Sequence, residues 1–212
     1  MPKTEPASRK SLYSVHPAVY MTMKWVAELK EKTGRSLEEW IAFCKKSGPP
    51  TEAARRDWLK KEHGLGTNAS WWIAERVEGK GDDDDTPEKY LASADRYVEK
   101  MFTGPKSTLR PIYDALLELG LGIAEDVKAC PCKTIVPLFR NYVIAQIKPA
   151  TRSRIDVGLA LGKHKGKLPA RLIDTGGLAK RDRITHRLEI TSLKDIDAEV
   201  KRWLKTAYDL DA

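Results

Sequence analysis

Apolar residues recur along the chain with two different periods, and the first period is helical. In residues 17–79 apolar side chains are three and four positions apart, as on helices that bury one face. Gly34, the Gly48–Pro50 segment and residues 63–68 interrupt this pattern and divide it into four short helices. Short helices are unstable alone. We therefore expect the four helices to pack together as a small bundle.

The second period begins after two further helical segments, residues 87–101 and 109–121. Ile155, Val157 and Leu159 alternate with polar or small residues, which is the period of a strand that buries one face. By composition and pattern, strands are expected in residues 127–130, 134–140, 142–148, 155–161 and 186–191, with a helix after Ser192. Helices, consecutive strands and a final helix predict an α+β fold, with an antiparallel sheet flanked by helices and covered on one face.

The same pattern predicts the domain organisation. Residues 1–16 are polar and contain proline, which indicates a disordered tail. Residues 80–86 contain glycine and four consecutive aspartates, and adjacent like charges favour an exposed linker. We therefore expect a helical domain at residues 17–79 and an α+β domain at residues 87–212, joined by the acidic linker.

Charge changes this picture because it is unevenly distributed. The 212-residue chain has a formal net charge of +8, and 32% of its residues are charged. Residues 133–187 contain 13 Lys and Arg against 3 Asp and Glu. Basic charge concentrated on one structural unit favours a polyanionic partner such as nucleic acid, or a small phosphorylated ligand. The alternative is a solvated basic face without a partner.

The predicted contact residues follow from this window. Arg152 and Arg154 place two guanidinium groups close together beside two hydroxyls, a combination that suits phosphate. The lysines of the GKHKGK segment lie in a long predicted loop, where flexible cations can contact a phosphate backbone. The full set of predicted nucleic-acid or anion contacts is Arg140, Lys148, Arg152, Arg154, Lys163, Lys165, Lys167, Arg181, Arg183 and Arg187.

Three other interpretations remain open. Arg154 and Asp156 can instead form cross-strand ion pairs with Arg187 and Glu189. Trp71 and Trp72 open the fourth helix, and exposed tryptophans would favour a protein-interaction adaptor. The acidic pair Asp156 and Glu189 could serve a metal-dependent hydrolase or nuclease.

Known catalytic motifs and cofactor signatures are not recognisable in the sequence. The histidines are scattered, Cys130 and Cys132 are too close for a usual zinc half-site, and GKHKGK lacks the spacing of a phosphate loop. We therefore predict no catalytic residues, no metal and no cofactor, and favour a nonenzymatic role. Three cysteines, no signal peptide and no long apolar segment predict a cytoplasmic protein without a membrane association.

Two stretches resemble uncharacterised bacterial families. Residues 17–79, with TGRSLEEWIAFCKKSG and WLKKEHGLG, resemble domain of unknown function 4287. Residues 105–210, with PIYDALL, KPATRSRIDVGLALG and THRLEITSLKDIDAEVKRWLKTAY, resemble domain of unknown function 5655. The resemblance implies a bacterial protein in which these domains occur in tandem. Relatives of the second domain are labelled as predicted transport proteins and sometimes accompany nuclease-like domains, but the resemblance implies no catalytic residues.

Overall fold

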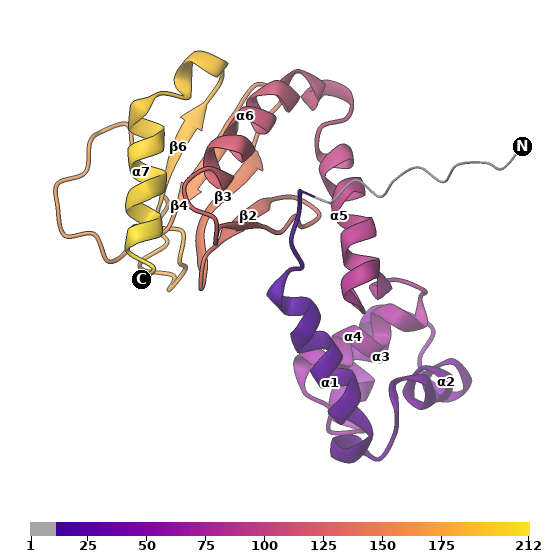
Figure 1. The fold of residues 1–212 in the computed structure, drawn as a ribbon. Helices are drawn as coiled ribbons and strands as arrows, with labels where there is room; N and C mark the ends of the chain where they lie inside the picture. The colour runs from indigo at the N-terminus through magenta and orange to yellow at the C-terminus, as the bar shows by residue number, and fades with distance from the viewer. Residues whose placement is uncertain (1–11) are drawn as a thin grey trace, which may run out of the picture. The chain divides into compact units, whose positions relative to one another are not determined.

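The computed structural model describes residues 12–212, which divide into two compact units. One unit is residues 15–93, and the other combines residues 12–14 with residues 94–212. Figure 1 shows helices in the first part of the chain and the sheet in the second. Residues 1–11 of the predicted tail lie outside the described residues.

The first unit contains the four expected short helices, which are α1 Pro17–Thr33, α2 Leu37–Ser47, α3 Glu52–Lys61 and α4 Thr67–Val77. A capping box begins α2: the Glu39 amide donates to Ser36 Oγ at 3.2 Å, and the Ser36 amide donates to Glu39 Oε2 at 2.6 Å. The four helices enclose a common core, made of Leu29, Leu37, Trp40, Cys44, Leu59, Leu65 and Ile73.

The acidic segment that follows is folded against its neighbours. Asp82–Asp84 form a 3₁₀ turn, and Lys89 Nζ lies 3.6 Å from Asp82 Oδ2. The buried guanidinium of Arg76 donates to Asp85. Helix α5, Pro87–Met101, begins directly after this turn, and the division between the two units falls within it.

The second unit is built on a sheet whose strand order is β1-β2-β3-β4-β6-β5, and every neighbouring pair is antiparallel. Its elements are η2 Gly104–Leu109, α6 Arg110–Leu121, β1 Lys128–Ala129, β2 Val136–Phe139, β3 Val143–Pro149, β4 Ile155–Leu159, β5 Ile173–Asp174, β6 His186–Ile190, η3 Leu193–Asp195 and α7 Ala198–Asp209. This confirms the predicted α+β class. The two-residue strand β5 lies within the segment that we expected to be a long loop.

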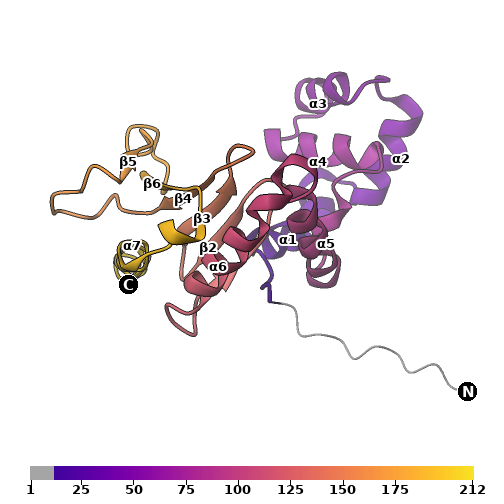
Figure 2. The ribbon, with the colours of Figure 1, turned by 90° about the horizontal axis from the view of Figure 1, so that it is seen from above.

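Alternation along the strands gives the sheet one apolar and one polar face. Ile147, Val157 and Leu188 are paired across β3, β4 and β6, and all three are buried. Helices α6 and α7 cover this apolar face together (Figures 1 and 2). Helix α6 approaches β2 so closely that a Cβ on Gly120 would lie 2.5 Å from Leu138 Cδ1. The opposite face is polar and bears charged side chains.

Residues 12–14 contact this second unit. The hydroxyls of Tyr13 and Tyr113 are 3.0 Å apart in the core, and the Ser14 amide donates to the Ala129 carbonyl at 2.9 Å. Burial raises the pKa of the Tyr13 phenol. In residues 12–212, the helices lack the length and apolar character that crossing a bilayer requires.

Candidate anion-binding surface

The predicted basic contacts do not form one patch, because the sheet distributes them between its two ends. Lys148 and Arg152 lie at the β3–β4 turn, whereas Lys163 follows the far end of β4. Strand β4 has five residues and therefore spans about 16 Å at about 3.3 Å per residue. Arg140, Lys163 and Arg183 lie at the end where β3 begins and β4 ends. Lys165, Lys167 and Arg181 lie in the connection between β4 and β6.

Two predicted contacts, Arg154 and Arg187, form a charge-balanced group with Asp156 and Glu189 on the polar face. Arg154 lies 2.8 Å from both carboxylates, and Arg187 does the same from β6. These four side chains are partly buried, with exposures of 16–34%. The cross-strand ion pairs considered from the sequence are confirmed, and the group has no surplus positive charge.

The same geometry bears on the hydrolase alternative. Both Asp156 and Glu189 contact two guanidinium groups, so their oxygens already have cationic partners. Within residues 12–212, His, Cys, Asp and Glu side chains do not form a group of three suited to holding a metal ion. The polar face is therefore best described as an ion-pair network between strands.

At the end of the sheet where β3 begins, two of the predicted cations also have acidic partners. Arg183 Nη2 donates to Asp211 Oδ1 at 2.5 Å, and the Asp211 side chain is only 3% exposed. Arg140 lies over the Tyr208 ring and pairs with Asp126 at 3.3 Å. These two arginines fasten the end of the chain to the sheet.

The lysines differ from these arginines because they lie on an exposed loop that runs alongside helix α7. The loop, residues 162–172, is held at its start, where Lys163 Nζ donates to the Leu210 carbonyl at 3.3 Å. Lys165 and Lys167 are exposed and have no acidic partner among residues 12–212. Arg152, Lys148 and Arg181 are likewise exposed and without an acidic partner among residues 12–212, but all three lie outside the lysine loop.

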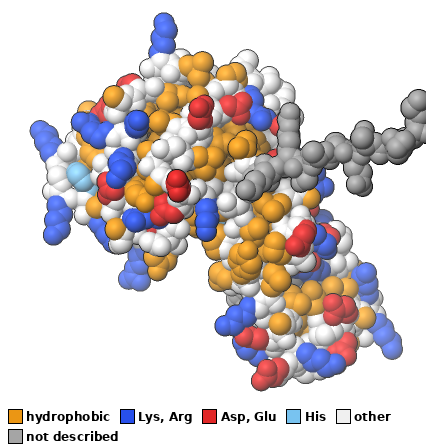
Figure 3. All heavy atoms as spheres, viewed as in Figure 1, with side chains coloured by type: hydrophobic (Ala, Val, Ile, Leu, Met, Phe, Trp, Pro, Cys, Tyr) orange, Lys and Arg blue, Asp and Glu red, His pale blue; other side chains and the backbone are white. Residues whose placement is uncertain are grey.

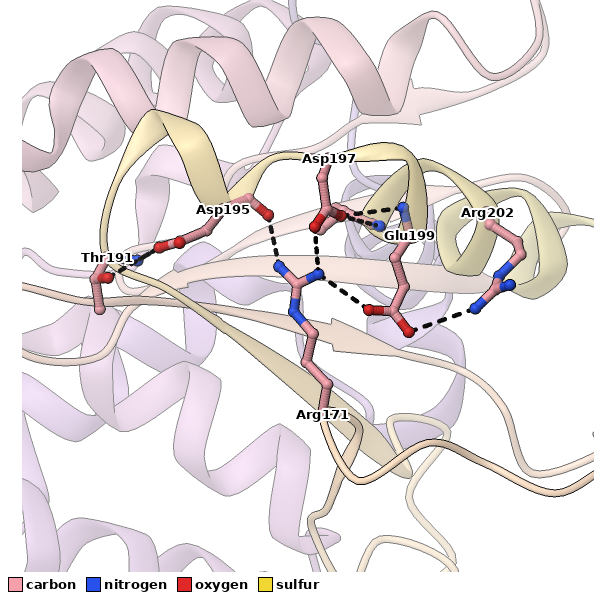
Figure 4. A network of polar contacts seen from close by, with 7 residues as sticks. Arg171, Thr191, Asp195, Asp197, Glu199 and Arg202 are labelled. Atoms are coloured by element: carbon pink, nitrogen blue, oxygen red, sulfur yellow. Dashed lines mark hydrogen bonds and ion pairs between the residues drawn. The ribbon is translucent and has the colours of Figure 1, made fainter.

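Arg171 holds the other end of this loop (Figure 4). Its guanidinium donates to Asp197 at 2.6 Å, to Glu199 at 3.1 Å and to the Asp195 carbonyl at 2.6 Å. A hydrogen bond from the Val200 amide and, to a smaller extent, one from Arg171 lower the pKa of Asp197. The loop is consequently fixed to both ends of α7, a 12-residue helix that is about 18 Å long.

A cleft of about 500 Å³ lies between the loop and α7. The His164 ring stands edge-on to Trp203, with 5.4 Å between ring centroids and an interplanar angle of 84°. Arg202 lies 5.3 Å from the Trp203 ring centroid and is 65% exposed. The cleft is lined by His164, Lys167, Leu168, Pro169, Arg202, Trp203 and Thr206.

We use the name loop–α7 surface for Lys163, Lys165, Lys167 and Arg202. Lys167 and Arg202 line the cleft, and Lys163 and Lys165 lie on the same loop. Figure 3 shows Lys and Arg side chains gathered over α7 and the neighbouring loop. The acidic group closest to it by contact, Glu199, is shared between Arg171 and Arg202. This surface therefore has a surplus of positive charge that the polar face of the sheet lacks.

Sequence reasoning missed Arg202, the contacts of Arg171 with the α7 region and the cleft itself. Arg202 is next to Trp203 on α7, and Trp203 is buried. Arg171 joins the lysine loop to α7 by contacting Asp197 and Glu199, which lie 26 and 28 positions later in the chain. Such a contact has no local sequence pattern.

The two tryptophans predicted for protein contact differ in their surroundings. Trp72 packs edge-on against Trp25, with 4.7 Å between ring centroids. Trp71 is 42% exposed, and the Arg56 guanidinium lies 5.7 Å from its ring centroid. Of the pair, only Trp71 presents much of its ring to solvent.

Comparison with known families gives two matches in the order expected from the resemblances. Residues 22–75 match the family described as domain of unknown function (DUF4287), and residues 98–211 match domain of unknown function (DUF5655). Neither the curated proteins nor the solved structures contain a match to the chain. The second family match covers more than half of the 212 residues. The chain therefore belongs to the family of domain of unknown function 5655.

Proposed function

We propose that this protein binds nucleic acid without catalysis, through the phosphate backbone and with the loop–α7 surface as the contact. The observation that supports the proposal is the difference between the two groups of cations. Arg154 and Arg187 are neutralised by carboxylates, whereas Lys165 and Lys167 are exposed and have no acidic partner among residues 12–212. Cations without partners can release the counterions of a polyanion.

The size of the loop–α7 surface sets the expected salt dependence. If its four cations each contact one phosphate, the logarithm of the binding constant should fall with the logarithm of salt concentration with a slope of about −2.8 to −3.6. Binding should then weaken by about 50- to 150-fold between about 50 and 200 mM salt. A simple solvated surface predicts no specific slope.

Fluorescence anisotropy tests this expectation with labelled single- and double-stranded DNA and RNA across a salt series. The variant Lys167→Gln should reduce the magnitude of the slope by about 0.7 to 0.9. Its matched control, Lys148→Gln, removes the same charge at the other end of the sheet and should leave the slope unchanged. Absence of binding at low salt, or a salt-independent signal, would reject the proposal.

A second candidate function is supported by exposed apolar side chains on the helical unit. Tyr20, Met21 and Trp71 are 57%, 67% and 42% exposed, and Met21 lies one helical turn before Trp25, which packs against Trp72. Contiguous exposed apolar surface is typical of protein-interaction sites. An adaptor of this kind would bind its partner in a salt-tolerant manner and lose it on Trp71→Ala, while Lys167→Gln would have no effect.

A further inference from the structure

The cleft between the loop and α7 is more than a row of cations, because one of its walls is apolar. Leu168 and Pro169 are half-buried in the loop, and Trp203 lies opposite them on α7 with 6% exposure. Inorganic phosphate and a duplex backbone present no base that could contact this apolar wall. A planar heterocycle attached to a phosphate matches both parts of the lining.

Volume and charge agree with a ligand of that kind. The cleft of about 500 Å³ falls within the range of roughly 300 to 1,000 Å³ that is usual for small-ligand sites. Lys167 and Arg202 border it. Arg202 is 65% exposed, pairs with Glu199 at 3.4 Å and lies 5.3 Å from the Trp203 ring centroid. Exposed pairs of this type are weak. The Arg202 guanidinium is consequently available to a phosphate.

The cleft is also held open by contacts outside it. Arg171 fixes the loop to the start of α7, and Lys163 fixes it near the end of the helix. A preformed site binds without the cost of ordering its walls. In addition, Trp203 Nε1 is buried without a hydrogen-bond partner among residues 12–212, although buried indole donors usually have one.

We propose that this cleft holds one nucleotide of a single-stranded nucleic acid, with the base against Leu168, Pro169 and His164 and the phosphate on Lys167 and Arg202. The proposal rests on the proposed function and adds its substrate class. Single strands are favoured because a base can enter the cleft only when it is unstacked from its neighbours. A duplex would contact the same cations from outside.

Isothermal titration calorimetry of the full chain with adenosine monophosphate and with ribose 5-phosphate, at constant ionic strength, tests the proposal directly. The two ligands share a phosphate and a sugar, and only the first has a base. Stacking and apolar contact of a base are worth about 1–3 kcal/mol, so adenosine monophosphate should bind about 5- to 150-fold more tightly. Equal affinities, or no binding of either ligand, would overturn the proposal.

Two variants and one control locate the site. Leu168→Ser should reduce the affinity for adenosine monophosphate by about tenfold. Duplex DNA binding and the unfolding midpoint should stay nearly unchanged. Arg202→Gln changes an exposed position and should reduce the affinity for both phosphorylated ligands. Arg152→Gln lies at the β3–β4 turn and should change neither affinity. If Leu168→Ser and Arg152→Gln have the same effect, the base does not occupy this cleft.

The outcomes separate this proposal from the proposed function. Binding of oligonucleotides without preference for adenosine monophosphate over ribose 5-phosphate would retain the backbone contact and reject the nucleotide cleft. Preferential binding of adenosine monophosphate without any binding of oligonucleotides would retain a mononucleotide site and reject nucleic acid as the partner.

Discussion

Arg171 allows the most specific prediction, because one side chain joins the lysine loop to the start of α7. Its ion pair with Glu199 is partly exposed, and a pair of this kind is worth about 0.2–1 kcal/mol; its pair with the more exposed Asp197 adds little. Its hydrogen bond to the Asp195 carbonyl at 2.6 Å adds about 1 kcal/mol. We therefore expect Arg171→Met to make opening of the loop about 1–2 kcal/mol easier.

Limited proteolysis by an endoproteinase that cleaves only after lysine measures this opening. The substitution leaves Lys163, Lys165 and Lys167 in place, so the cleavage sites within the loop are unchanged. If cleavage follows the population of the open loop, a change of about 1–2 kcal/mol should accelerate it by about 5- to 30-fold. Mass spectrometry of the fragments identifies cleavage within the loop.

Arg202→Met is the matched control, because it removes an arginine on α7 whose ion pair with Glu199 is 3.4 Å long and largely exposed. Its effect on loop cleavage should stay within about twofold. The reasoning is refuted if Arg171→Met leaves the cleavage rate unchanged, or if the control accelerates cleavage equally. Either result would mean that the Arg171 contacts do not hold the loop on α7.

Three further predictions concern the same unit. Asp211→Asn should destabilise it to urea by about 2–3 kcal/mol, because the buried Oδ2 accepts from two backbone amides and Oδ1 accepts from Arg183; an unchanged urea midpoint contradicts this. Gly120→Ala should destabilise the unit by about 1–2 kcal/mol, because the new Cβ would lie 2.5 Å from Leu138 Cδ1. Helix propensity alone predicts the opposite, a gain of about 1 kcal/mol. A raised melting temperature would therefore disprove the close contact. The pKa of Asp197 is lowered in the folded protein. Its contribution to folding stability is therefore complete above its unfolded pKa of about 3.9 and is lost as pH falls through the folded value. The difference in urea midpoint between wild type and Asp197→Ala should narrow below about pH 4, and a difference that stays constant would contradict this.

The fold was largely predictable because its elements have strong local signals. The alternation through Ile155, Val157 and Leu159 identified β4 and its buried side, and Gly34 and the Gly48–Pro50 segment marked the two limits of α2. These patterns depend only on neighbouring residues and on the period of a helix or strand. A two-residue strand such as β5 is too short to produce a period.

The site was less predictable because charge in sequence does not give position in space. Residues 133–187 form a continuous basic window, but each antiparallel strand moves the chain from one end of the sheet to the other. Lys148 and Lys163 therefore lie at opposite ends, and Arg154 and Arg187 meet carboxylates from two strands. The contacts of Arg171 with α7 depend on how the loop closes, which no local pattern records.

Charge reversal at two matched positions tests most directly whether the loop–α7 surface is where nucleic acid binds. Lys165→Glu with Lys167→Glu, and separately Lys148→Glu with Arg152→Glu, make the same change in net charge at opposite ends of the sheet. Anisotropy with labelled single-stranded DNA at low salt should show a loss of affinity of at least about tenfold for the first pair and little change for the second. Equal losses for both pairs, or a larger loss for the second, would contradict the assignment of binding to the loop–α7 surface.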